Sequence, residues 1–264
     1  MMTQEPINQQ KSDKASEAAT LHNQAMIDME HGEYNAAQEK YQRSLEICQQ
    51  IGDKEGEAAT LHNLATIDME HGEYNAAQEK YQRSLEISQQ IENKAGEATT
   101  WHQLASIDLE RGDYNAAQEK YQKSLEINQQ IGDEAGEAAS WHQLATIDLK
   151  HGDYDLAQEK YQKSLEINQQ IGDEVGEATT IAQIGIMVAG EGHAEEGLRL
   201  VTLSAMILKD IGDADLKQVE PWVNRLASEL EYSQERFGAM LQEVAEAYRQ
   251  DQGRGLVEAA LGAR

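Results

Sequence analysis

The stretch GEATTWHQLASIDLERGDYNAAQEKYQKSLEINQQI, residues 96–131, decides the fold because close copies of it recur along the chain. The copies at residues 56–91 and 136–171 stand 40 positions away on either side, without a gap. An earlier copy begins at Ala15, and a degenerate fifth copy begins at Val175. A period of this length is typical of proteins in which one small structural unit stacks on its neighbours.

Each copy divides into two segments whose apolar residues recur at helical spacing. In the third copy these positions are Trp101, Leu104, Ala105 and Ile107 in the first segment and Tyr114, Ala117, Tyr121 and Leu125 in the second. Gly112-Asp113 separates the segments, and Gly132-Asp133 separates the copies. We interpret each pair as a glycine that ends one helix and an aspartate that caps the next. Each copy is therefore predicted to be a hairpin of two antiparallel helices of roughly 15–18 residues.

Charge narrows the classes of partner. The chain of 264 residues has 48 acidic and 22 basic side chains and a formal net charge of −26. Such a chain is a poor candidate for binding nucleic acid or an anionic membrane surface, because both are recognised through Lys and Arg. The N-terminal residues show no secretory signal, and no apolar run is long enough to cross a bilayer. Together with a lone cysteine, Cys48, this predicts a soluble cytoplasmic protein.

The recurring pattern resembles the tetratricopeptide repeat family. Its signature positions in the third copy are Trp101, Leu104, Ala105, Gly112, Tyr114, Ala117, Tyr121 and Ser124-Leu125. The 40-residue period exceeds the usual 34, and IGD stands in place of the closing proline, as in the long-repeat subgroup found in kinesin light chains, cell-polarity adaptors and bacterial regulators. The resemblance implies an all-α, right-handed α-α superhelical solenoid of about five helix pairs with a C-terminal helical cap.

The repeats set the expected organisation of the chain. We expect a polar N-terminal tail over residues 1–14, then four near-identical repeats at 15–54, 55–94, 95–134 and 135–174. A degenerate fifth repeat follows at 175–212, then capping helices at 213–250, and a tail or short helix at 251–264. Within the cap, Pro221 suits the first residue of a helix and Ser233 suits an N-cap.

The resemblance also implies a ligand groove, because the first helix of each repeat lines the concave face in this family. The candidate groove residues are His22, Asn23, His62, Asn63, Thr66, Glu70, His102, Gln103, Ser106, Glu110, His142, Gln143 and Thr146. An Asn or Gln amide has donors and an acceptor, so it can pair with a peptide group. The rim residues Glu70 and Glu110 favour a neutral or basic peptide over the acidic C-termini that carboxylate-clamp members bind.

The histidines have two readings that the sequence leaves open. They are either a polar ladder for a bound segment or positions copied along with the repeat. A metal site is disfavoured, because two imidazoles from neighbouring repeats fall short of the three or four ligands that zinc needs. The repeated aspartates Asp28, Asp68, Asp108 and Asp148 stand where the family often has tyrosine, and each needs a partner. A lysine of the second helix, such as Lys120, or a tyrosine hydroxyl would serve.

Catalysis is not expected. The chain has no glycine-rich phosphate loop, no HExxH or CxxC spacing, and no nucleophile paired with a base. We therefore predict no catalytic residue, no metal and no cofactor.

The function predicted is a non-enzymatic scaffold that binds a peptide or helix of a partner protein. Two alternatives remain. In the first, the chain is a structural protein that associates with itself, although Gln24, at the position equivalent to Leu64, favours a monomer. In the second, the chain is a recently amplified or engineered array without a dedicated ligand, since neighbouring copies differ at few positions.

Overall fold

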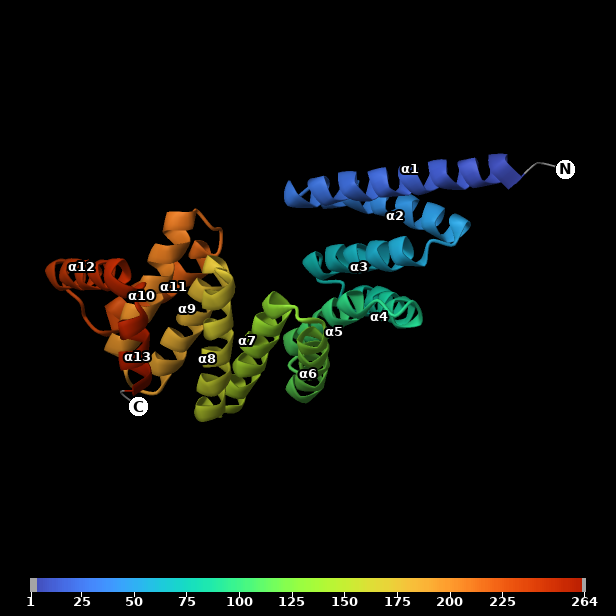
Figure 1. Cartoon of the computed structure of the whole chain (residues 1–264). Helices are drawn as coiled ribbons and strands as arrows, with labels where there is room; N and C mark the ends of the chain where they lie inside the picture. The colour runs from blue at the N-terminus through green and yellow to red at the C-terminus, as the bar shows by residue number, and fades with distance from the viewer. Residues whose placement is uncertain (1–3, 263–264) are drawn as a thin grey trace. The chain divides into compact units, whose positions relative to one another are not determined.

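The computed structural model describes residues 4–262, and in this range the chain forms thirteen α-helices and no strand (Figure 1). Their bounds are α1 Gln4–Glu30, α2 Tyr34–Ile51, α3 Lys54–Glu70, α4 Tyr74–Gln90, α5 Lys94–Glu110, α6 Tyr114–Ile131, α7 Glu134–His151, α8 Tyr154–Ile171, α9 Glu174–Gly190, α10 Ala194–Ile211, α11 Leu216–Glu229, α12 Gln234–Asp251 and α13 Arg254–Gly262. The predicted all-α repeat fold is confirmed.

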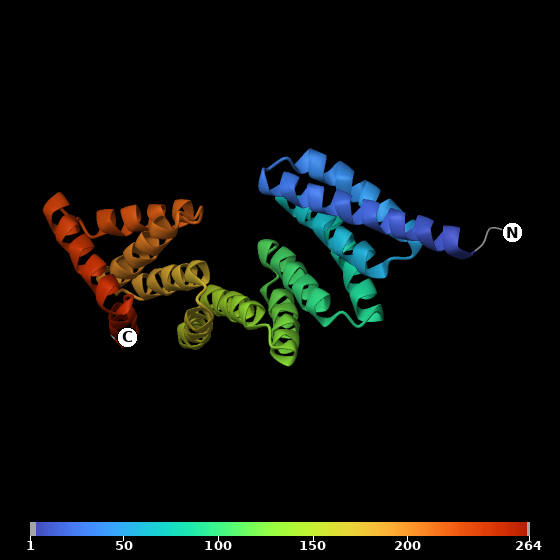
Figure 2. The same ribbon diagram turned by 45° about the horizontal axis from the view of Figure 1, so that its top comes forward.

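The first ten helices form five hairpins, α1/α2 through α9/α10, in which each helix packs chiefly on its hairpin partner. We call the first helix of each hairpin the A helix and the second the B helix. The chain divides into two compact units, Met1–Gly132 and Asp133–Arg264. Unit 1 holds α1 to α6 and unit 2 holds α7 to α13, and within each unit the successive hairpins stack on one another (Figure 2).

The turns explain why the helices end where they do. Gly112 has φ +78° and Gly132 has φ +71°, a left-handed conformation that costs an L side chain energy. The Asp133 side chain accepts a hydrogen bond from the Gly136 backbone N at 3.0 Å, so it caps α7 as predicted. The predicted cap by Asp113 is wrong, because that residue precedes α6 at ψ 62° and its side chain makes no capping bond. The backbone N of Asp113 instead donates to the Asp108 carbonyl at 2.8 Å, which closes the turn.

Tyrosines of the B helices form the centre of each hairpin, as the stripe predicts. Tyr81 and Tyr121 in unit 1 and Tyr161 in unit 2 are fully buried. Around them pack small or branched residues of the A helices, such as Ala65 and Ile107. In unit 2 one continuous core runs from the hairpins into the C-terminal helices. Each hairpin thus depends on its neighbour to cover its apolar stripe.

The N-terminal segment differs from the expectation. The residues 4–14, expected as a polar tail, belong to α1, and residues 1–3 lie outside the described range. Glu, Gln and Lys are good helix formers, and the Lys14 ammonium donates to the Gln50 side chain at 3.0 Å. Helix α1 therefore extends beyond the start of the first repeat.

Three helices follow the fifth hairpin. The structure makes Arg254–Gly262 a short helix, α13, and Ser233 caps α12 by accepting from the Arg236 backbone N at 3.1 Å. The expectation that Pro221 begins a helix is wrong, because α11 already starts at Leu216. A turn in which the Asp213 side chain accepts from the Asp215 backbone N at 2.8 Å starts that helix earlier.

Candidate functional site

The candidate histidines stand on the A helices, half-buried against the B helix of the same hairpin. Each ring meets a buried tyrosine edge to face, with centroids 5.0 Å apart for His62 and Tyr81 and 4.9 Å apart for His102 and Tyr121. Such pairs add stability beyond the area they bury. The imidazole is therefore part of the packing of its own hairpin.

The same rings also contact the next hairpin. Nδ1 of His22 lies 3.2 Å from the Thr60 hydroxyl, and Nδ1 of His62 lies 3.4 Å from the Thr100 hydroxyl. Burial lowers the pKa of His62 and of His102 to about 4, because it disfavours the charged ring. Both rings are neutral near pH 7, and the contacts of His22 and His62 link successive repeats.

The hydroxyls at the next groove position are also engaged. Thr66, Ser106 and Thr146 each lie within 3.0 Å of a tyrosine hydroxyl, those of Tyr81, Tyr121 and Tyr161. Burial raises the pKa of each of these three tyrosines to about 12, so the phenols stay protonated. This hydrogen bond joins the A helix to the B helix of the same hairpin.

The amides of the groove are more available. Asn23 is exposed, whereas Asn63, Gln103 and Gln143 are half-buried. The Asn63 amide nitrogen lies 3.2 Å from Nε2 of His22, while among residues 4–262 the side chains of Gln103 and Gln143 have no hydrogen-bond partner. Glu70 and Glu110 end their helices as exposed carboxylates. On this face the exposed polar groups are therefore amides and carboxylates such as those of Asn23, Glu70 and Glu110, whereas the imidazoles are engaged in packing.

A pocket recurs at the same place between successive hairpins. In unit 1 the first pocket, between α1, α2 and α3, measures about 200 Å³, and the second, between α3, α4 and α5, about 240 Å³. In unit 2 an equivalent pocket between α7, α8 and α9 measures about 200 Å³. The shared lining includes the groove histidine and amide of each A helix, which are His22 and Asn23, His62 and Asn63, and His142 and Gln143.

These pockets include residues that the sequence reasoning missed. Ala59 and Glu55 of α3 line both unit 1 pockets, and Thr99 of α5 lines the second. Glu55 lies in the first turn of its helix, and Ala59 and Thr99 lie in the second turn of theirs. Their only sequence signal is their spacing from the histidine of the same helix, which is one turn for Ala59 and Thr99 and two turns for Glu55. Small residues there leave the space that the pocket occupies.

The repeated aspartates are explained by the lysines of the B helices. Lys40, Lys80, Lys120 and Lys160 form ion pairs with Asp28, Asp68, Asp108 and Asp148 in turn. The aspartates are buried, so each pair meets the requirement that a buried charge has a partner. Each pair joins the A and B helices of one hairpin, which makes these aspartates structural.

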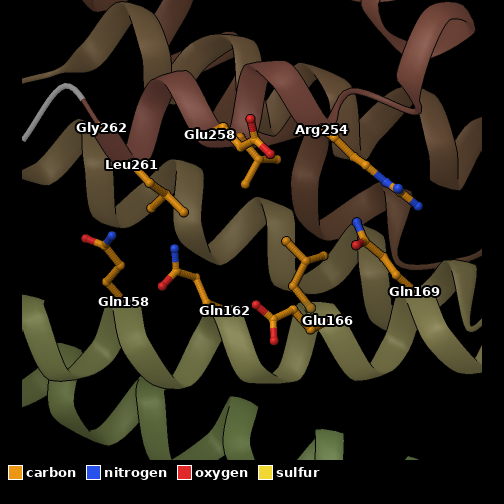
Figure 3. Close-up of a pocket in the computed structure, with 10 residues that line it drawn as sticks. Gln158, Gln162, Glu166, Gln169, Arg254, Glu258, Leu261 and Gly262 are labelled. Atoms are coloured by element: carbon orange, nitrogen blue, oxygen red, sulfur yellow. The ribbon is translucent and has the colours of Figure 1, made fainter.

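A different cavity lies in unit 2 between α8 and α13 (Figure 3). It measures about 370 Å³, and its lining combines Gln158, Gln162, Glu166 and Gln169 of α8 with Arg254, Glu258 and Leu261 of α13. The spacing of Arg254, Glu258 and Leu261 places them on one face of α13. The sequence did not indicate that this face lies beside α8.

Two further observations bear on chemistry. Among residues 4–262, no three or more His, Cys, Asp or Glu side chains are grouped so as to hold a metal ion. In the same range, no helix is long and apolar enough to span a membrane.

Comparison with known proteins gives the family. A comparison with curated proteins found no match. Among solved structures, BtubC (BKLC) from P. vanneervenii aligns over 88% of this chain and 94% of its own, at 20% identity and a TM-score of 0.56. A putative kinesin light chain from Podosopora anserina, with nearly identical TPR-like repeats, aligns over 75% of this chain and 97% of its own, at 17% identity and a TM-score of 0.59.

The third structure is a signal transduction ATPase with a tetratricopeptide repeat sensor, PH0952 from Pyrococcus horikoshii. It aligns over 95% of this chain and 38% of its own, at 16% identity and a TM-score of 0.67. At these identities the three structures support the fold alone. The family model described as tetratricopeptide repeat matches residues 16–90 and 96–170, which is more than half of the chain. The chain therefore belongs to the tetratricopeptide repeat family.

Proposed function

We propose that the chain is a non-enzymatic scaffold that binds a peptide or helical segment of a partner protein along its A helices. The partner segment is neutral to basic, and the chain acts as a cytoplasmic monomer. Proteins of this family generally bind protein partners and are generally not enzymes. The specific mode proposed for this chain rests on its own surface.

The recurring pocket is the observation that supports this mode. Equivalent pockets in unit 1 and unit 2 combine an amide, small side chains and the start of the next A helix. An extended segment presents side chains and peptide groups at regular intervals, which matches a surface that repeats its pocket and its amide. A set of residues repeated in each hairpin also does not build one unique catalytic centre.

The charge of the A helices supports the nature of the partner. Glu70 and Glu110 remain exposed, while the buried aspartates are already neutralised by lysines. With a net charge of −26, the chain repels acidic segments and attracts basic ones.

The test is a triple replacement of the groove amides. Asn63, Gln103 and Gln143 are changed together to Ala, and each protein is immobilised in equal amount and exposed to lysate from the source organism. We expect the proteins retained by the unchanged chain to be depleted at least tenfold, because each lost amide pairing costs roughly 1 kcal/mol. Retained proteins are quantified by mass spectrometry.

The matched control changes Gln42, Gln82 and Gln122 to Ala, because these exposed amides lie on B helices. This control should retain the same proteins as the unchanged chain. Equal retention by all three proteins would overturn the groove proposal and favour an array without a dedicated ligand.

A second candidate function, self-association, rests on the uncovered face of α1. Ile27 is 51% exposed, whereas its equivalent Ile67 is 0% exposed beneath the preceding hairpin. Such a face is suited to pair with the same face of a second copy. Light scattering at two concentrations separates the candidates: a mass that rises with concentration and falls on replacing Ile27 with Glu would support the dimer over the monomer.

A further inference from the structure

We infer that Glu55 turns the two pockets of unit 1 into sites for a Lys or Arg side chain of the bound segment. This inference rests on the proposed function and deepens it, because it says which ligand side chain lies at which repeat. It concerns only α1 to α5, which belong to one compact unit.

Glu55 is placed where both pockets share a wall. It lies in the first turn of α3 and lines the first pocket as well as the second. The other repeats have small or apolar residues at the equivalent position, namely Ala15, Ala95, Ala135 and Val175. The carboxylate is therefore a property of this one place and not of the repeat.

The Glu55 carboxylate is not neutralised by the protein. Its neighbour Lys54 pairs with Glu57 at 2.8 Å, and Arg83 lies 3.6 Å from the same carboxyl group. Within the described range no ion pair involves Glu55, and its side chain is exposed. Lys54 and Arg83 are thus paired with Glu57, and Glu55 is left to line the pockets without a basic partner.

Both pockets contain negative charge without positive charge. Neither lining includes a lysine or an arginine. Burial lowers the pKa of the lining residues His22 and His62, so their rings are neutral near pH 7. In the first pocket, burial and then the Asp53 carboxylate raise the pKa of the Cys48 thiol, which keeps it protonated. Asp53 also accepts from the Gly56 backbone N at 3.0 Å and so offsets the positive end of α3.

The remaining walls suit the rest of a basic residue. Ala59 borders both pockets, and Ala18 and Ala58 supply further methyl groups against which an alkyl stem can lie. Asn23 in the first pocket and Asn63 in the second present amides for the ligand backbone. A guanidinium or ammonium group then forms a charge-assisted hydrogen bond with Glu55.

The test uses capped amino acids as probes. N-acetyl-arginine methylamide and its uncharged counterpart N-acetyl-norleucine methylamide are titrated into full-length protein labelled with ¹⁵N-glycine. The backbone amides of Gly56 and Gly96, one in each pocket, are the reporters. We expect the arginine probe to shift both signals saturably, with a Kd on the order of millimolar for a ligand of this size. The norleucine probe should bind at least fivefold more weakly.

The variant Glu55→Gln keeps the size and removes the charge, so its Kd for the arginine probe should rise at least fivefold. The repeat offers a rescue, because Ala95→Glu places a carboxylate in the first turn of α5, beside the second pocket. In Glu55→Gln/Ala95→Glu, the shift at Gly96 should return while that at Gly56 stays lost. Circular dichroism spectra should be unchanged in both variants.

Absence of saturable shifts in the unchanged protein, or equal affinity of Glu55→Gln, would overturn the inference. The inference would also be overturned if the arginine probe failed to shift the Gly96 signal in Glu55→Gln/Ala95→Glu. None of these results affects the capture of partners by the groove amides, so failure here is distinguishable from failure of the proposed function.

Discussion

Single side chains in this protein connect neighbours that the sequence pattern alone leaves separate. The sequence indicated that Asp108 needs a partner and named Lys120 as one candidate, and the structure pairs them. It did not indicate that His62 faces Tyr81 on one side and Thr100 of the next repeat on the other. A periodic pattern shows that a position recurs, but not which of its atoms meet a neighbour.

Replacing Lys120 with Met should destabilise the protein by about 1–3 kcal/mol, because it leaves the buried Asp108 carboxylate without its hydrogen-bond donor. Asp108→Asn should cost less, since Lys120 is 22% exposed and can turn to water. The double variant should be less destabilised than the sum of the two by about 1 kcal/mol. Urea unfolding followed by circular dichroism measures these differences, and strict additivity would contradict a direct pair.

The half-buried histidines His62 and His102 predict that unit 1 is sensitive to acid. The folded-state pKa of both His62 and His102, about 4, lies below the 6.5 of an exposed histidine, so the unfolded chain binds protons first as pH falls. The contribution of the neutral rings to the free energy of unfolding is therefore fully present above pH 6.5. It is lost as the pH falls from 6.5 to about 4, at about 1.4 kcal/mol per pH unit for each histidine.

Carboxylates titrate in part of the same window, so the measurement compares variants. The double variant His62→Gln/His102→Gln should show a shallower fall in unfolding free energy between pH 6.5 and 5. An identical slope in both proteins would show that these rings are not buried in the neutral form.

At the scale of helices, the residues of the turns made the helix ends largely predictable from the sequence. Glycines such as Gly112 end helices in the left-handed conformation, as their spacing predicts. The predictions were wrong at two places where local signals compete. Asp113 has the sequence pattern of an N-cap, but its turn is closed by a backbone hydrogen bond. Pro221 has the pattern of a first helical residue, but it lies inside α11. Local sequence does not show which of two adequate signals the surrounding structure uses.

Gly112→Ala should destabilise by about 1–2 kcal/mol, because alanine at φ +78° is strained although no neighbouring atom lies within 4 Å. Gly238→Ala is the matched control: it lies inside α12 with free space around it and should stabilise by roughly 0.5–1 kcal/mol. Thermal unfolding shifts of opposite sign are expected. Shifts of the same sign would show that the backbone at Gly112 is not left-handed.

At the scale of the whole molecule, the repeat period gave the fold class, but not the cavity between α8 and α13. That cavity joins segments far apart in sequence, and α13 lies outside the repeats, so no period predicts its neighbour. The inter-repeat pockets were likewise missed, because they arise from small residues such as Ala59, which give no chemical signal.

Stability should be unequal along the chain. Helix α1 is covered by neighbours on one side only, whereas α9 and α10 lie in the large core of unit 2. In an array of nearest-neighbour contacts, a terminal hairpin opens first. Hydrogen exchange should therefore be faster in α1 and α2 than in α9 and α10. Equal protection would indicate a covered α1 face, as in a dimer.

The most direct test of partner binding along the A helices is site-specific photocrosslinking. A benzophenone amino acid is placed at exposed Ala59 or Thr99, beside the unit 1 pockets, or at exposed Gln82 on the B helix α4. Each protein is irradiated in lysate from the source organism. We expect the same partner to be crosslinked from Ala59 and Thr99 and not from Gln82. A partner crosslinked from Gln82 alone, or equally from all three positions, would contradict binding along the A helices.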